Sequence, residues 1–186
     1  MIQLDSSHPF DWAESTRYFR EDIASLAKTL SLRSSPDSIL DVSSVEADVT
    51  PFGRQVPCFV SAFLAWDFGF SGRSYGVDPV TATDIPSIRR SLREDPGLAR
   101  VLGEGFLPMF HIVGGVTLYV YLPKQTEPCA DSFVVAAHVV PAGWHFVANS
   151  TRKCLSLLGA IVQCREAGYP ERLGSSVPPI LREWLL

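Results

Sequence analysis

Two apolar runs in the second half of the chain, residues 106–122 and 133–146, dominate its pattern of hydrophobic and polar positions. The first run contains Gly114 and Gly115, a pair that permits the positive φ angles of a tight hairpin turn. One strand is therefore predicted before the pair and one after it. In the second of these strands alternate side chains share a face, so that one face is apolar (Val116, Leu118, Val120, Leu122) and the other carries hydroxyl groups that can meet solvent or a partner (Thr117, Tyr119, Tyr121).

The second apolar run predicts two further strands. Residues 133–140 are nearly all apolar, which is typical of a central strand. Residues 141–143, Pro-Ala-Gly, form a turn that leads into a strand over residues 144–148. The sequence thus predicts paired, mainly antiparallel strands, but it does not fix their order.

Helical periodicity marks both sides of this strand region. Between residues 12 and 32 the apolar positions repeat at three and four residues, which puts them on one helical face. Asn149, Ser150 and Thr151 provide a helix cap, and the stripe that follows predicts a helix over residues 150–167 that covers the sheet. The stripe consists of Cys154, Leu155, Leu157, Leu158, Ile161 and Val162.

Three shorter helices are predicted elsewhere. One runs over residues 58–68, where Pro57 favours the first turn. Another begins at Asp84 or Ser87 and is interrupted by a Pro-Gly pair. The last lies at the end of the chain after two prolines, and either packs back on the fold or meets a partner. Residues 43–53 mix acids and prolines without a clear period and predict a loop or an edge element.

Together these elements predict an α+β fold with a mainly antiparallel central sheet and helices at the N-terminus and after the last strand. The chain has 186 residues, of which 46% are apolar, and this is enough for one substantial core. A single domain over residues 1–186 is therefore expected.

The charge of the chain is −4 and is unevenly distributed. Residues 1–52 hold nine acidic against four basic side chains, whereas residues 53–186 hold eleven against twelve. Nucleic-acid binding is not expected, because the affinity for phosphates comes from clustered Lys and Arg, and the chain has no such cluster. A membrane span is not expected either, since the longest uncharged stretch, residues 105–123, contains Pro108, His111 and the glycine pair.

The four cysteines, Cys58, Cys129, Cys154 and Cys164, show no CxxC spacing. An N-terminal aspartate pair interrupts any early apolar run, so no signal peptide is predicted. Reduced thiols in a cytoplasmic protein are the simplest interpretation. No cofactor is expected.

Few residues are candidates for metal binding or catalysis, and a role in packing explains each of them equally well or better. Cys129, His138 and His145 carry ligand types that zinc prefers, but the two histidines are separated by a turn and have core-like neighbours. Cys58 lies near a predicted helix start, where the helix dipole lowers the pKa of a thiol. The residues that follow it are apolar, however, so a buried and unreactive thiol is favoured. His111 lies between a strand start and a glycine turn, and remains the second candidate for an enzyme site. No catalytic residue is assigned.

Two surface features suit the binding of a protein partner. The first is a set of acids in an irregular stretch that could steer a basic partner: Asp37, Asp41, Glu46 and Asp48. The second is an aromatic cluster with two charged residues, a composition enriched at binding hot spots: Trp66, Phe68, Phe70 and Tyr75 with Asp67 and Arg73.

Three short motifs, in the order of the predicted elements, resemble those of one family. They are a proline-led segment from Val56-Pro57 through Phe63-Leu64 to Gly69, a strand start at Phe106-Leu107-Pro108-Met109-Phe110 with Gly114-Gly115, and a helix entry at Val147-Ala148-Asn149-Ser150 with Leu155 and Leu158. With the N-terminal helix, this order resembles the SUKH superfamily, the Smi1/Knr4-like proteins. The resemblance covers about residues 10–168, which places residues 169–186 in a C-terminal extension.

The resemblance implies an α+β domain whose bacterial members are commonly immunity proteins that bind and neutralise toxins. It transfers no catalytic residue. We therefore expect a cytoplasmic toxin inhibitor, not an enzyme, that occludes a cognate toxin or effector and is a monomer or weak dimer. An acidic N-terminal third would complement a basic, nuclease-like toxin. The alternatives are a secretion chaperone or adaptor, and a small enzyme with a Cys58 or His111 site.

Overall fold

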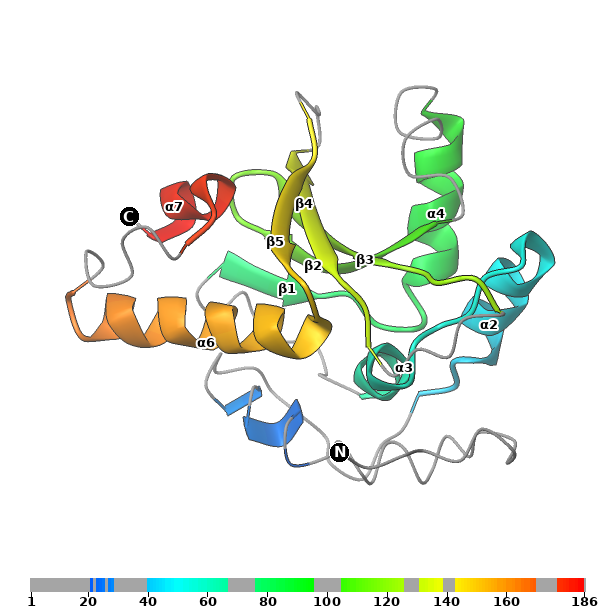
Figure 1. The fold of residues 1–186 in the computed structure, drawn as a ribbon, viewed down its shortest axis with the longest axis horizontal. Helices are drawn as coiled ribbons and strands as arrows, with labels where there is room; N and C mark the ends of the chain where they lie inside the picture. The colour runs from blue at the N-terminus through cyan, green and yellow to red at the C-terminus, as the bar shows by residue number, and fades with distance from the viewer. Residues whose placement is uncertain are drawn as a thin grey trace.

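Five antiparallel strands form the centre of the fold (Figure 1). They lie side by side in chain order: β1 (Val77–Pro79), β2 (Phe106–Ile112), β3 (Val116–Tyr121), β4 (Val134–His138) and β5 (His145–Ala148). The predicted α+β class with an antiparallel sheet is confirmed. The computed structural model describes Glu21 and residues 23–25, 27–28, 40–66, 76–95, 105–125, 131–138, 143–169 and 177–185.

Besides a partly described helix at residues 21–28, five α-helices lie around the sheet in the described part of the chain. They are α2 (Ser43–Val49), which continues into the short 3₁₀ helix η1 (Thr50–Phe52), then α3 (Cys58–Ala65), α4 (Ile85–Glu94), α6 (Thr151–Glu166) and α7 (Pro179–Leu185). Helices α3 and α6 lie together on one side of the sheet, and α4 stands beside it (Figure 1). The three predicted helices that begin near residues 58, 84 and 150 are confirmed.

The β2–β3 hairpin forms at the predicted glycine pair. Gly114 and Gly115 have φ angles of 97° and 78°, which side chains with a Cβ rarely adopt. Phe106 pairs with Tyr121 and Ile112 with Val116, with a bulge between Pro108 and Phe110. Alternation along β3 then places its apolar side chains against the helices, as predicted. The hydroxyl-bearing face is less exposed than predicted, because Thr117 and Tyr119 are buried and only Tyr121 is partly exposed.

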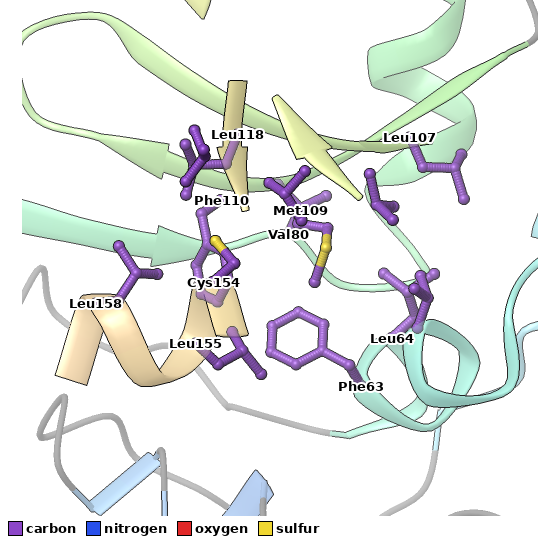
Figure 2. Packing of buried hydrophobic residues seen from close by; sticks show 14 of the residues in the cluster. Phe63, Leu64, Val80, Leu107, Met109, Phe110, Leu118, Cys154, Leu155 and Leu158 are labelled. Atoms are coloured by element: carbon purple, nitrogen blue, oxygen red, sulfur yellow. The ribbon is translucent and has the colours of Figure 1, made fainter. Parts of the chain in front are cut away.

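The main core lies between this apolar face and the helices α3 and α6 (Figure 2). Phe63 of α3 and Phe110 of β2 are fully buried, and their rings meet at 5.1 Å between centroids with a 55° tilt. The same core includes Val177, Ile180 and Leu181. The last helix therefore packs back on the fold, which was one of the two predicted alternatives.

The start of α6 is fixed by two side chains. The Ser150 hydroxyl accepts a hydrogen bond from the Lys153 backbone at 3.1 Å, so the predicted cap is confirmed. The Asp131 carboxylate accepts from the backbone N–H groups of Thr151 at 2.9 Å and Arg152 at 3.1 Å. A carboxylate at this end also interacts favourably with the helix dipole.

The predicted loop over residues 43–53 is wrong, because residues 43–49 form α2. Val45 and Val49 are buried on one face of this helix, and the Asp41 carboxylate accepts hydrogen bonds from the Ser43 backbone and hydroxyl at its start. Seven residues are under two helical turns, too few for the repeat to be recognised among acids and prolines.

The predicted first helix falls mostly outside the described residues. Where it is described, at residues 21, 23–25 and 27–28, the chain is helical. Ile23 and Ala27, four residues apart, are buried in the main core. This spacing agrees with the predicted apolar face.

Candidate functional site

The face of the sheet opposite the main core carries aromatic side chains from three strands and two adjoining loops. Register places Phe106 beside Tyr121, and Val135 lies between Tyr119 and Phe146. We refer to this surface as the aromatic face; it consists of Phe106, Tyr119, Tyr121, Phe133, Trp144 and Phe146.

The rings of the aromatic face hold one another in place. Trp144 stacks on Phe106 at 5.4 Å between centroids with a 15° tilt, and meets Tyr119 edge-on at 5.5 Å. Phe133 stacks on Tyr121 at 4.8 Å. Phe146 is 61% exposed. The result is a preorganised apolar surface with one aromatic side chain projecting into solvent.

A cationic side chain, Arg54, contacts Tyr121 of the aromatic face. The Arg54 Nη1 donates to the Tyr121 hydroxyl at 2.8 Å and to the Leu122 carbonyl at 3.0 Å. Its guanidinium carbon lies 5.4 Å from the Tyr121 ring centroid, within range of a cation–π interaction. Arg54 therefore fixes the orientation of Tyr121.

A pocket of about 280 Å³ lies where the edge strand β1 meets the β2–β3 turn. Its lining includes Asp78 of β1 and His111 of β2, which are paired in register. The His111 Nδ1 and the Thr117 hydroxyl oxygen are 3.0 Å apart. The described lining residues are Gly76, Asp78, His111, Ile112, Val113, Gly114 and Gly115.

His111 is exposed as a residue, but its ring is partly shielded from solvent. This partial burial lowers the pKa of the imidazole, and the charges of Asp78 and Asp84 only partly counteract it, so the ring is neutral near pH 7. A neutral imidazole can accept a proton or a hydrogen bond. The Thr117 hydroxyl beside it is buried, and therefore poorly placed to act as a nucleophile on a bound molecule.

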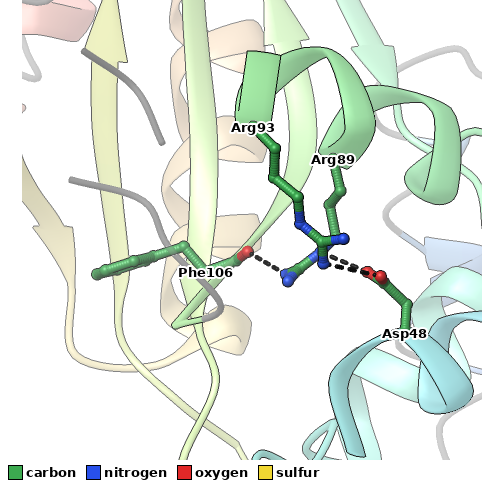
Figure 3. A network of polar contacts seen from close by, with 4 residues as sticks. All are labelled: Asp48, Arg89, Arg93 and Phe106. Atoms are coloured by element: carbon green, nitrogen blue, oxygen red, sulfur yellow. Dashed lines mark hydrogen bonds and ion pairs between the residues drawn. The ribbon is translucent and has the colours of Figure 1, made fainter. Parts of the chain in front are cut away.

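One member of the predicted acidic set, Asp48, takes part in ion pairs within the fold. Asp48 lies in an internal network, where its carboxylate pairs with Arg89 at 2.5 Å and with Arg93 at 2.9 Å (Figure 3). Arg89 is 3% exposed and its Nη1 also donates to the Phe106 carbonyl at 3.0 Å. Asp48 therefore connects α2 to α4, and 20% of its side chain remains exposed.

Two of the predicted acids remain near the surface of α2. Asp41 is exposed, and hydrogen bonds from the Ser43 backbone and hydroxyl hold its pKa below the usual value. Glu46 is half-buried; burial and, to a lesser degree, the charge of Asp41 raise its pKa. Asp37 lies outside the described residues.

The predicted aromatic cluster is corrected at Trp66. This side chain is 2% exposed in the main core, and it is not available to a partner. The other members of the cluster lie outside the described residues: Asp67, Phe68, Phe70, Arg73 and Tyr75.

The thiols and metal candidates show no shared site in the described part of the chain. Cys58 is half-buried at the start of α3, and His145 is exposed on β5. Cys129 lies outside the described residues, and of His138 only the backbone is described. Among the described side chains, no group of three or more His, Cys, Asp or Glu is placed to hold a metal ion.

Cys154 is expected to resist alkylation in the native protein. Burial raises the pKa of its thiol to about 12, the nearby Asp131 charge adds to the shift, and the reactive thiolate is absent near neutral pH. Iodoacetamide labelling followed by peptide mass mapping should find Cys154 unmodified and half-buried Cys164 modified. Unfolding in urea provides the control, since Cys154 should then react; native labelling of Cys154 would contradict its burial.

The sequence did not predict most of the aromatic face, nor that Asp78 lies beside His111. Alternation in β3 identified Tyr119 and Tyr121, but not the rings that fold against them from β2 and the loops. Asp78 was missed because β1 has only three residues and ends in Pro79. A strand this short has no detectable period.

A comparison with protein-family models, curated proteins and solved structures finds no match for this chain. In the described residues, no helix combines the length and apolar character needed to cross a membrane.

Proposed function

We propose that this chain is a cytoplasmic immunity-type protein that binds a cognate toxin and neutralises it by occlusion. The observation that carries the proposal is the aromatic face, on which Phe146 is 61% exposed beside five rings that pack on one another. The resemblance to the SUKH superfamily supports the same function. Inhibition by occlusion needs a rigid complementary surface and no catalytic group.

The composition of this face suits protein recognition. Tyr, Trp and Phe are enriched at the centres of interfaces, and rings already fixed by their neighbours lose little conformational entropy on binding. The −4 charge of the chain favours association with a basic partner, such as a nuclease-like toxin. Exposed Asp41 can contribute to this attraction at the start of α2.

Replacing Phe146 with aspartate is expected to weaken binding of the cognate toxin by about 100-fold, the effect of losing a hot-spot aromatic residue of ~3 kcal/mol. The toxin is sought among proteins encoded next to this one, produced with its catalytic residue disabled, and titrated by calorimetry. The matched control is Tyr169→Asp, which changes another partly exposed aromatic residue beyond the end of α6. Equal affinities of the two variants would exclude the aromatic face as the toxin-binding surface.

The His111 pocket favours a second candidate function, a small enzyme that uses this imidazole as a base. A neutral imidazole beside the Asp78 carboxylate is a suitable general base. Against it, Cys58 does not line the pocket, and the Thr117 hydroxyl is buried. A turnover whose pH profile follows the His111 ionisation and is lost in His111→Gln would favour this function over toxin binding.

A further inference from the structure

Two cationic side chains, those of Arg54 and Lys124, lie opposite each other where the segment after η1 meets the segment after β3. They form an antiparallel bridge, and beside it the Gln55 N–H donates to the Pro123 carbonyl at 3.1 Å. Residues directly opposite each other in an antiparallel pair have their side chains on one face, with Cβ atoms about 4.5–5.5 Å apart. The two positive charges are therefore neighbours.

Neither of these charges is balanced by a carboxylate. The Arg54 Nη1 donates to the Tyr121 hydroxyl and to the Leu122 carbonyl, both of which are uncharged. Within the described part of the chain, neither Arg54 nor Lys124 forms an ion pair. Like charges directly opposite each other destabilise a pair of strands, so an anion between the two side chains would be bound favourably.

The two side chains are accessible to such an anion. Lys124 is exposed and Arg54 is half-buried. A Cβ atom at Gly105 would lie 3.7 Å from the Arg54 Nη2 and 3.8 Å from the Tyr121 Cε2. The φ angle of Gly105 lies outside the left-handed region, so its backbone does not require glycine. The missing side chain leaves room beside the guanidinium.

The cationic pair is continuous with the aromatic face, because Tyr121 belongs to that face and contacts Arg54. The Tyr121 ring stacks on Phe133 at 4.8 Å between centroids. A ligand that reaches both features therefore carries an anion next to an apolar group. A nucleic acid is disfavoured, since its affinity grows with the number of neutralised phosphates, and the chain as a whole has a charge of −4.

We propose that Arg54 and Lys124 bind an aspartate or glutamate side chain of the protein partner, while an apolar neighbour of that residue packs on the aromatic face. The Nη2 and Nε donors of Arg54 have no acceptor among the described residues, and a planar carboxylate matches such a pair of donors. This contact sets the register of the complex, whereas the net charge of the chain acts at long range. The assignment of the ligand to a protein partner rests on the proposed function.

The first test titrates the isotopically labelled full chain with a short peptide, N-acetyl-phenylalanyl-glutamic acid amide, and follows the side-chain resonances of Arg54 and Tyr121. We expect a saturable shift with a dissociation constant in the millimolar range. The matched peptide with glutamine in place of glutamic acid should bind about three to five times more weakly, the effect of one partly exposed charge pair. Equal binding of the two peptides, or no shift, would overturn the proposal.

Inorganic phosphate, titrated in the same way, distinguishes a side-chain site from a general anion site. It has the charge without the apolar group, so it should bind more weakly than the acidic peptide and leave the Phe133 resonances unchanged. Phosphate binding as tight as that of the acidic peptide would overturn the assignment to an acidic side chain.

Two charge reversals localise the effect. Lys124→Glu changes an exposed side chain and should abolish the preference for the acidic peptide. Lys153→Glu, also exposed but at the start of α6, changes the net charge by the same amount and should leave the preference unchanged. A preference retained in Lys124→Glu, or lost equally in both variants, would contradict the assigned site.

These titrations use the chain without a toxin, so the two proposals fail separately. Selective binding of the acidic peptide with no toxin neutralised would leave the Arg54 and Lys124 site standing and remove the immunity function. Conversely, neutralisation of a toxin with full affinity by Lys124→Glu would keep the immunity function and overturn the role of this pair in it.

Discussion

Replacing Phe110 with alanine is expected to lower the free energy of unfolding by about 3–5 kcal/mol. Phe110 is fully buried in the main core, and its ring meets Phe63 of α3. The change removes apolar burial and leaves a cavity between β2 and the helices, which can relax only partly. Against a typical total of about 5–15 kcal/mol, this is a large loss, and urea unfolding followed by circular dichroism measures it.

The control for this prediction is Phe146→Ala. This ring has the same size but is 61% exposed, so its removal should change the unfolding free energy by no more than about 0.5 kcal/mol. A comparable loss in both variants would contradict the assignment of the two residues to opposite faces of the sheet. The comparison also separates stability from binding, because only Phe146 is expected to matter for the partner.

Replacing Asp48 with alanine is expected to destabilise the fold by about 3–5 kcal/mol. The change removes the carboxylate that pairs with Arg89, whose guanidinium is 3% exposed between α4 and the sheet (Figure 3). A buried cation without this counter-charge is costly, and the ion pairs that join α2 to α4 are lost with it. Chemical denaturation of the variant measures the effect.

Two further variants test the cause of this destabilisation. Arg93 also pairs with Asp48 but is 44% exposed, so Arg93→Ala should cost less than about 1 kcal/mol. The double variant Asp48→Leu/Arg89→Met removes both charges and should recover most of the loss, because a well-packed apolar pair often replaces a buried ion pair at little cost. A double variant less stable than Asp48→Ala would show that Arg89 stabilises the fold mainly through other contacts.

The elements that the sequence predicted correctly are those with strong local signals. The β2–β3 hairpin needed the positive φ angles of Gly114 and Gly115, and α6 began at the side-chain cap of Ser150. Long apolar runs then identified β3, β4 and the helix that covers them. In each case a few neighbouring residues determine the backbone, so the sequence alone carries the information.

The elements that it missed depend on contacts between distant residues. Helix α2 is short and held in place by Val45 and Val49 in the core, and β1 is ordered by pairing with β2. The same distinction applies to the candidate sites. Asp48 was expected at the surface because Arg89 and Arg93, more than forty positions later in the chain, could not be recognised as its partners.

His111 shows how much of a site the sequence can indicate. Its position before a glycine turn made it a candidate, and the structure places it in a pocket beside Asp78. Pairing between β1 and β2 brings Asp78 beside His111, and burial of the ring lowers the pKa of the imidazole. Only the three-dimensional structure relates them.

The central claim is that this chain neutralises a toxin by binding it. The most direct measurement is the growth of cells that express the toxin encoded beside this protein, alone and together with the wild type, Phe146→Asp or Tyr169→Asp. We predict that the wild type and Tyr169→Asp restore growth and that Phe146→Asp does not, at equal protein levels. Failure of the wild type to restore growth with any neighbouring toxic product would contradict the immunity function.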